Sequence, residues 1–141
     1  MTGVQTCALP ILVLGLDLGG ACRGIAYRVA AKQRADTLGY LRAREQATAV
    51  YRETVRVAWL AGKPERRVDA VCYAVDRSHP QYAGRLSHDR QLHLVRQGHG
   101  RSGNNRDYVI ETVSALEALN IRDADLHLLA ERLKGSAHQD V

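Results

Sequence analysis

The stretch YRETVRVAWL, residues 51–60, followed after a short turn by RVDAVCYAV, residues 67–75, decides the fold of this chain. In the first run Val55, Val57 and Trp59 alternate with other residues, which is the period-two pattern of a β-strand. The second run alternates in the same way, with Val68, Ala70, Cys72 and Ala74. Gly62-Lys63-Pro64 between them is a turn signal. We therefore predict an antiparallel hairpin with strands at 51–60 and 67–75.

On the N-terminal side of this hairpin, residues 32–46 carry Leu38, Leu41 and Glu45 at helical spacing and predict a helix. Residues 12–18 form a short apolar run, Gly19-Gly20 is a turn signal, and residues 23–29 return as a second run. We predict a β-hairpin over residues 12–29.

On the C-terminal side the patterns are helical, at residues 88–97, 106–119 and 123–133. The second of these helices carries an apolar stripe of Val109, Val113, Leu116 and Leu119. We expect Asn105 and Asp123 to cap the helices that follow them. Because strands come early and helices late, we predict an α+β fold with a mainly antiparallel sheet.

Composition limits the classes of function. The 141 residues are 45% hydrophobic and 25% charged, which fits one soluble globular domain. The net charge of +5 is scattered and not interleaved with aromatic residues, so we expect no nucleic-acid partner. No apolar run reaches the roughly 18–20 residues of a membrane span.

Cysteine and histidine spacing argues against a metal or a disulfide framework. The three cysteines, Cys7, Cys22 and Cys72, form no CxxC pair, and free thiols fit a reducing cytoplasm. The six histidines show no metal-ligand spacing. We therefore expect no metal site.

The ends of the chain differ from its middle. Residues 1–11, MTGVQTCALPI, resemble one translated reading frame of a sequencing adapter, so we predict a non-native segment there and a missing natural N-terminus. Residues 12–134 are the predicted domain, and residues 135–141 are a polar tail.

Two glycine motifs resemble nucleotide-binding motifs, but neither lies among the neighbouring elements that such a motif needs. LGLDLGG, residues 14–20, resembles the phosphate-binding hairpin of sugar kinases and actin-like ATPases, but nothing after residue 30 supplies that fold's other nucleotide loops. A fragment of such a kinase is the remote alternative. GHGRSG, residues 98–103, follows a predicted helix, whereas a dinucleotide fingerprint follows a strand.

Four stretches, taken together, resemble the ChaC-type γ-glutamylcyclotransferases. They are GIAYR at 24–28, YLxxRE at 40–45 with Tyr51 beyond it, DxxHPxY at 76–82, and GxNxDYV at 103–109. The resemblance covers nearly all of residues 12–134. It implies a small mixed β-barrel flanked by helices and an enzyme that needs no cofactor.

The resemblance also implies a reaction and a site. Glutathione, or another γ-glutamyl small molecule, would be cleaved to 5-oxoproline and an amine, Cys-Gly in the case of glutathione. Glu45 falls on the family's catalytic glutamate and would be the general acid/base, while Tyr51 and Tyr108 are candidates to line the substrate pocket.

The chain departs from the family pattern in its first strand and loop, where the expected Tyr-Gly-Ser-Leu stretch is absent. That loop would hold the γ-glutamyl carboxylate, so we expect this chain to be truncated and inactive as written. A non-catalytic binding or interaction module on the same barrel remains the alternative. Nothing in the sequence fixes the oligomeric state.

Overall fold

The computed structural model describes residues 2–6, 11–100 and 103–135. It divides into two compact units. The first unit spans Leu16–Tyr82. The second unit combines Thr2–Gly15 with the chain from Ala83 onward.

The first unit is built on the predicted hairpin. Strand β3 spans Tyr51–Leu60 and β4 spans Arg66–Val75. They pair antiparallel over their whole length, from Tyr51 opposite Val75 to Leu60 opposite Arg66. The turn between them contains Gly62 and a cis Lys63–Pro64 peptide bond. The hairpin predicted from residues 51–60 and 67–75 is therefore confirmed.

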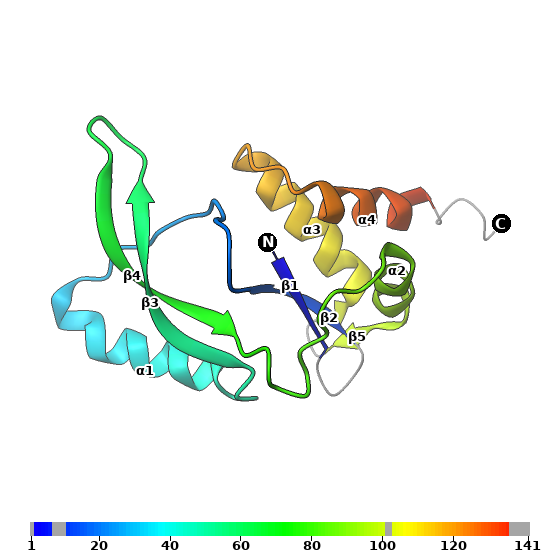
Figure 1. The fold of residues 1–141 in the computed structure, drawn as a ribbon, viewed down its shortest axis with the longest axis horizontal. Helices are drawn as coiled ribbons and strands as arrows, with labels where there is room; N and C mark the ends of the chain where they lie inside the picture. Colours follow the sequence, from blue (N-terminus) through cyan, green and yellow to red (C-terminus); the bar gives the residue numbers. More distant parts are fainter. Residues whose placement is uncertain (1, 7–10, 101–102, 136–141) are drawn as a thin grey trace. The chain divides into compact units, whose positions relative to one another are not determined.

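The predicted helix before this hairpin is also confirmed. A short 3-10 turn, Ala31–Gln33, leads into α1, Arg34–Glu45. Helix α1 lies beside the β3–β4 hairpin (Figure 1). Val50, in the link between the two, is fully buried, and its carbonyl accepts a 2.7 Å hydrogen bond from the amide of Asp76.

The hairpin predicted over residues 12–29 is wrong. Only its first half is a strand, β2 at Leu12–Leu16, whose last residue pairs in parallel with Ala74 of β4. Residues 17–30 contain no strand, and Ile25 and Tyr27 are exposed. Alternation shows which residues suit a strand, but a strand forms only where a partner edge accepts its hydrogen bonds.

One face of the hairpin is more exposed than its apolar character suggests. Val55, Val57 and Trp59 lie on the same face, as the alternation predicts, and Val71 stands opposite Val55. All four side chains are exposed, and the indole of Trp59 is 66% exposed. Period-two spacing defines a face, and tertiary contacts decide whether anything covers it.

Three helices form the second unit: α2 at His88–Gln97, α3 at Asn105–Ala118 and α4 at Ala124–Gly135. They pack with β2 around one apolar core. Its buried members are Leu12, Leu92, Leu94, Val95, Val109, Val113, Leu126, Leu129, Ala130 and Leu133. The predicted stripe of α3 is confirmed at Val109 and Val113, and Leu116 packs against this core, but Leu119 is exposed.

The predicted helix caps have opposite outcomes. Asp123 caps α4 as expected, because its Oδ1 accepts a 3.0 Å bond from the amide of Leu126. The cap of α3 is Asn104, whose Oδ1 accepts a 2.7 Å bond from the amide of Asp107. The cap assigned to Asn105 is therefore wrong.

Asn105 instead joins α3 to β2. Its side chain is buried, and it bonds both backbone groups of Leu12. The amide of Leu12 donates to Oδ1 at 2.6 Å, and Nδ2 donates to the carbonyl of Leu12 at 2.7 Å. The side chain thus pairs with two buried backbone groups of β2.

The glycine-rich stretch before α3 contains two short strands, β5 at His99–Gly100 and β6 at Gly103–Asn104, which pair antiparallel. The predicted loop at 98–103 is partly outside the described residues, because 101 and 102 are not among them. The amide of Asn105 donates to the carbonyl of Gly98 and closes this hairpin.

The fold class is α+β, as predicted, with a mixed sheet in which β3–β4 is antiparallel and β2–β4 is parallel. Strand β1, Thr2–Thr6, is the neighbour of β2, and the strand order is β1-β2-β4-β3. Within the described residues we find no helix long and apolar enough to cross a membrane.

Candidate active site

Glu45, the predicted general acid/base, is the last residue of α1. Its side chain is 30% exposed, and Oε1 lies 3.3 Å from Nε of Arg44. Helix α1 ends here because the next residues turn toward β3: the amide of Gln46 still bonds back to Arg42, and that of Ala49 bonds to Gln46. Glu45 is thus a half-buried carboxylate at a helix-to-strand corner, and its catalytic role stays a prediction.

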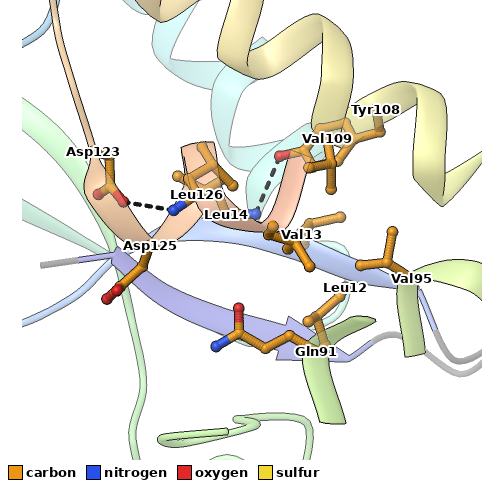
Figure 2. A pocket seen from close by; sticks show the side chains of 11 residues that line it. Leu12, Val13, Leu14, Gln91, Val95, Tyr108, Val109, Asp123, Asp125 and Leu126 are labelled. Atoms are coloured by element: carbon orange, nitrogen blue, oxygen red, sulfur yellow. Dashed lines mark hydrogen bonds between the residues drawn. The ribbon is translucent and has the colours of Figure 1, made fainter. Parts of the chain in front are cut away.

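The two tyrosines predicted to line the pocket lie in different units. Tyr51 is the first residue of β3, is half-buried, and belongs to the same unit as Glu45. Tyr108 is on α3 in the second unit, where its hydroxyl accepts a 3.1 Å bond from the amide of Leu14 (Figure 2). Glu45 and Tyr51 therefore belong to the same unit, and Tyr108 contacts β2 in the other.

A polar cluster next to Glu45 was missed by the sequence analysis. Glu53 of β3 accepts two bonds of 2.7 Å from the guanidinium of Arg42 on α1. Its Oε2 also accepts a 2.9 Å bond from the hydroxyl of Tyr73 on β4. The hairpin register puts Glu53 opposite Tyr73, so that pair was within reach of sequence reasoning. The contact of Arg42 with Glu53 depends on how α1 packs against β3, which the sequence patterns do not show.

The electrostatics of this cluster link it to Glu45. The bidentate bond from Arg42, followed by the bond from Tyr73, lowers the pKa of Glu53 to about 2. The pKa of Tyr73 is raised, first by burial and then by its bond to Glu53 and the charge of Glu53, with a smaller contribution from the charge of Glu45. Glu45 therefore acts on the same phenol as Glu53.

A second cluster surrounds Asp17. Its side chain is 9% exposed and accepts bonds from Arg77 Nε at 2.8 Å, from the amide of Leu18 at 2.7 Å and from the hydroxyl of Tyr82 at 3.0 Å. Arg77 also donates to the carbonyl of Leu18. Asp17 of the LGLDLGG stretch thus holds the loop after β4 through Arg77 and Tyr82.

We expect Asp17→Asn to lower stability at neutral pH by about 1–2 kcal/mol, because bonds to a charged acceptor are replaced by weaker ones. The bond from Arg77, opposed by burial, lowers the pKa of Asp17 in the folded chain. A lowered folded-state pKa adds stability above the unfolded value of about 3.9 and loses it as pH falls through the folded value. The free energies of unfolding of the unmodified chain and of Asp17→Asn, measured in urea, should therefore differ at pH 7 and converge below about pH 4. A difference that persists unchanged at acid pH would contradict this assignment.

The loop after β4 is further fixed by Asp76. It accepts bonds from the hydroxyl and the amide of Ser78 at 2.7 and 3.0 Å and from Arg52 Nε at 2.8 Å. The bonds from Ser78, followed by Arg52, lower the pKa of Asp76 to about 2. His79 and Tyr82, which share the DxxHPxY motif with Asp76, therefore lie on an ordered turn.

A small cavity of about 70 Å³ lies in the second unit and is shown in Figure 2. It is lined by β2 residues, by Gln91 and Val95 of α2, by Tyr108 and Val109 of α3, and by residues at the start of α4. Small-molecule sites usually measure roughly 300–1,000 Å³. A cavity of this volume is too small for a tripeptide, and Tyr108 is the one predicted pocket residue among those that line it. No group of three or more potential metal ligands occurs in the parts of the chain that the structure describes.

Two comparisons with known proteins match almost the whole chain. The family model described as ChaC-like protein matches residues 3–135. A glutathione-specific gamma-glutamylcyclotransferase of Escherichia coli (strain K12) is 28% identical over 134 residues, which is 94% of this chain. The chain spans 56% of the length of that relative. Because the family match covers far more than half of the sequence, this chain belongs to the ChaC-like protein family.

Proposed function

We propose that this chain carries the acid/base half of a γ-glutamylcyclotransferase active site, with glutathione as substrate and Glu45 as the general acid/base. The observation that carries the proposal is the position of Glu45, a half-buried carboxylate at the end of α1, in a chain of the ChaC-like family. The Escherichia coli relative is a glutathione-specific enzyme, which supports glutathione as the substrate here.

The proposed reaction needs one group that moves protons. The α-amine of the γ-glutamyl group attacks its own γ-carbonyl carbon, a new C–N bond closes the five-membered ring, and the γ-amide C–N bond breaks. Glu45 takes a proton from the attacking amine and gives it to the leaving nitrogen of Cys-Gly. The products are 5-oxoproline and Cys-Gly, and no water is consumed. Because the attack is intramolecular, the protein mainly orients the substrate and handles the proton.

We further propose that substrate binding needs a Tyr-Gly-Ser-Leu loop, which this sequence does not contain. Tyr51 would line the pocket from the same unit as Glu45, and Tyr108 would contribute from α3. The origin of residues 1–11, which the family match partly includes, stays a prediction.

The test is release of 5-oxoproline from glutathione. It compares the 141-residue chain with an extended chain in which a segment that carries a Tyr-Gly-Ser-Leu loop replaces residues 1–11. We expect activity in the extended chain and none in the 141-residue chain. Activity in the 141-residue chain would refute the need for that loop. An extended, folded chain that releases no 5-oxoproline from glutathione or other γ-glutamyl amines would favour the non-catalytic interaction module.

A further inference from the structure

Glu45 shares its helix face with an arginine that is already engaged elsewhere. Arg42 precedes Glu45 by three residues, and side chains at this spacing are neighbours on a helix. Without other partners, two opposite charges at this spacing attract each other. The guanidinium of Arg42 instead makes its two bonds of 2.7 Å with Glu53 on β3.

We propose that Glu53 is a positioning residue for Glu45: it holds the guanidinium of Arg42 on β3, away from the Glu45 carboxylate, and anchors the hydroxyl of Tyr73 beside it. This inference rests on the proposed role of Glu45 and adds three residues that the family resemblance does not assign. A bidentate pair with a 25% exposed carboxylate fixes both the distance and the direction of the arginine.

Charged and titratable groups from three elements bear on Glu45. Arg44 on α1 lies 3.3 Å from its carboxylate, and the charge of Glu45 reaches Tyr73 on β4. Arg42, three residues earlier on α1, is paired with Glu53 on β3. Arg44 is 66% exposed and Arg42 is 53% exposed, so solvent screens both charges. Arg42 is the cation whose position a second residue controls, and the Arg42–Glu53 pair is neutral as a unit.

This arrangement predicts that two single variants shift the pH profile of activity in opposite directions. In Glu53→Gln, Arg42 loses its partner and its positive charge is free to approach Glu45. A nearby cation favours the ionised carboxylate, so the acid limb of the kcat/KM profile should move to lower pH by about 0.5–1 unit. In Arg42→Met the unpaired carboxylate of Glu53 disfavours ionisation of Glu45, and the limb should move to higher pH. The double variant removes both charges and should return the limb to its original position.

The experiment has two independent readouts. The pH profile of 5-oxoproline release is measured on the extended chain, and the carboxyl ¹³C resonance of Glu45 is titrated by NMR on the 141-residue chain. Opposite shifts in the two single variants and recovery in the double variant are expected in both. Unchanged midpoints, or shifts of the same sign, would overturn the positioning role. If glutathione is not cleaved at all, the proposed function fails, while the NMR titration still decides the inference.

A purely structural clamp between α1 and β3 gives a different result. It would lower the melting temperature of both single variants alike without moving the acid limb in opposite directions. Circular dichroism shows whether each variant is folded, and Tyr73→Phe is the matched control. That substitution removes the bond to Glu53 but leaves the Arg42–Glu53 pair, so the limb should move less than in Glu53→Gln.

Discussion

Replacing Glu45 with glutamine in the extended chain is expected to lower 5-oxoproline release by about 10²–10⁴-fold, the range that general acid/base catalysis contributes. Glutamine keeps the size and polarity of the side chain and cannot accept the proton of the attacking amine. Because substrate contacts elsewhere are retained, we expect the loss in kcat, with KM changed little.

The control for this variant is Glu65→Gln, on the exposed turn between β3 and β4. It makes the same chemical change in the same unit, and its activity should equal that of the unmodified chain. Both variants should unfold at the same temperature as the parent. If Glu45→Gln retains full activity while folded, the role given to Glu45 is refuted.

Replacing Asn105 with alanine should destabilise the second unit by about 2–6 kcal/mol. The side chain bonds the amide and the carbonyl of Leu12, and both residues are 3% exposed. Removal leaves two buried backbone groups without these partners, and each such group costs about 1–3 kcal/mol. Urea unfolding of the 141-residue chain, followed by far-ultraviolet circular dichroism, measures the loss.

The adjacent Asn104→Ala is the matched control, since it removes the helix cap of α3 and should cost only about 1 kcal/mol. Hydrogen exchange gives a local readout: the amide of Leu12 should exchange faster in Asn105→Ala than in Asn104→Ala. Equal losses of stability in the two variants would show that the link from α3 to β2 contributes little.

Short-range sequence patterns were sufficient to predict the helices and strands that depend on residues close together in the chain. The hairpin β3–β4, the helix α1 and the helix α2 follow from alternation, helical spacing and turn residues, which act over a few positions. The cap by Asp123 has the same basis, because its acceptor and donor are three residues apart. Asn104 and Asn105 look equivalent in sequence, and only the approach of β2 separates their roles.

Residues 23–29 show that a local pattern can predict a strand that does not form. Ile25, Tyr27 and Val29 alternate as in a strand, yet the segment is exposed and unassigned to any sheet. The same limit applies to Val55, Val57 and Trp59, whose shared face was predictable and whose exposure was not. Burial and strand pairing involve segments that are distant in the sequence. A periodic pattern does not show which distant segment packs against a face or pairs with a strand.

By itself the sequence determined the α+β class, the hairpin, most helices and the resemblance that singled out Glu45, because these depend on short-range spacing and on residue types at fixed intervals. The tertiary structure alone decided what surrounds Glu45. The bonds of Glu53 to Arg42 and Tyr73 join α1, β3 and β4, and those of Asn105 join α3 to β2. Such contacts exist only once separate elements have packed, since each needs donor and acceptor atoms from distant positions within about 3 Å of each other.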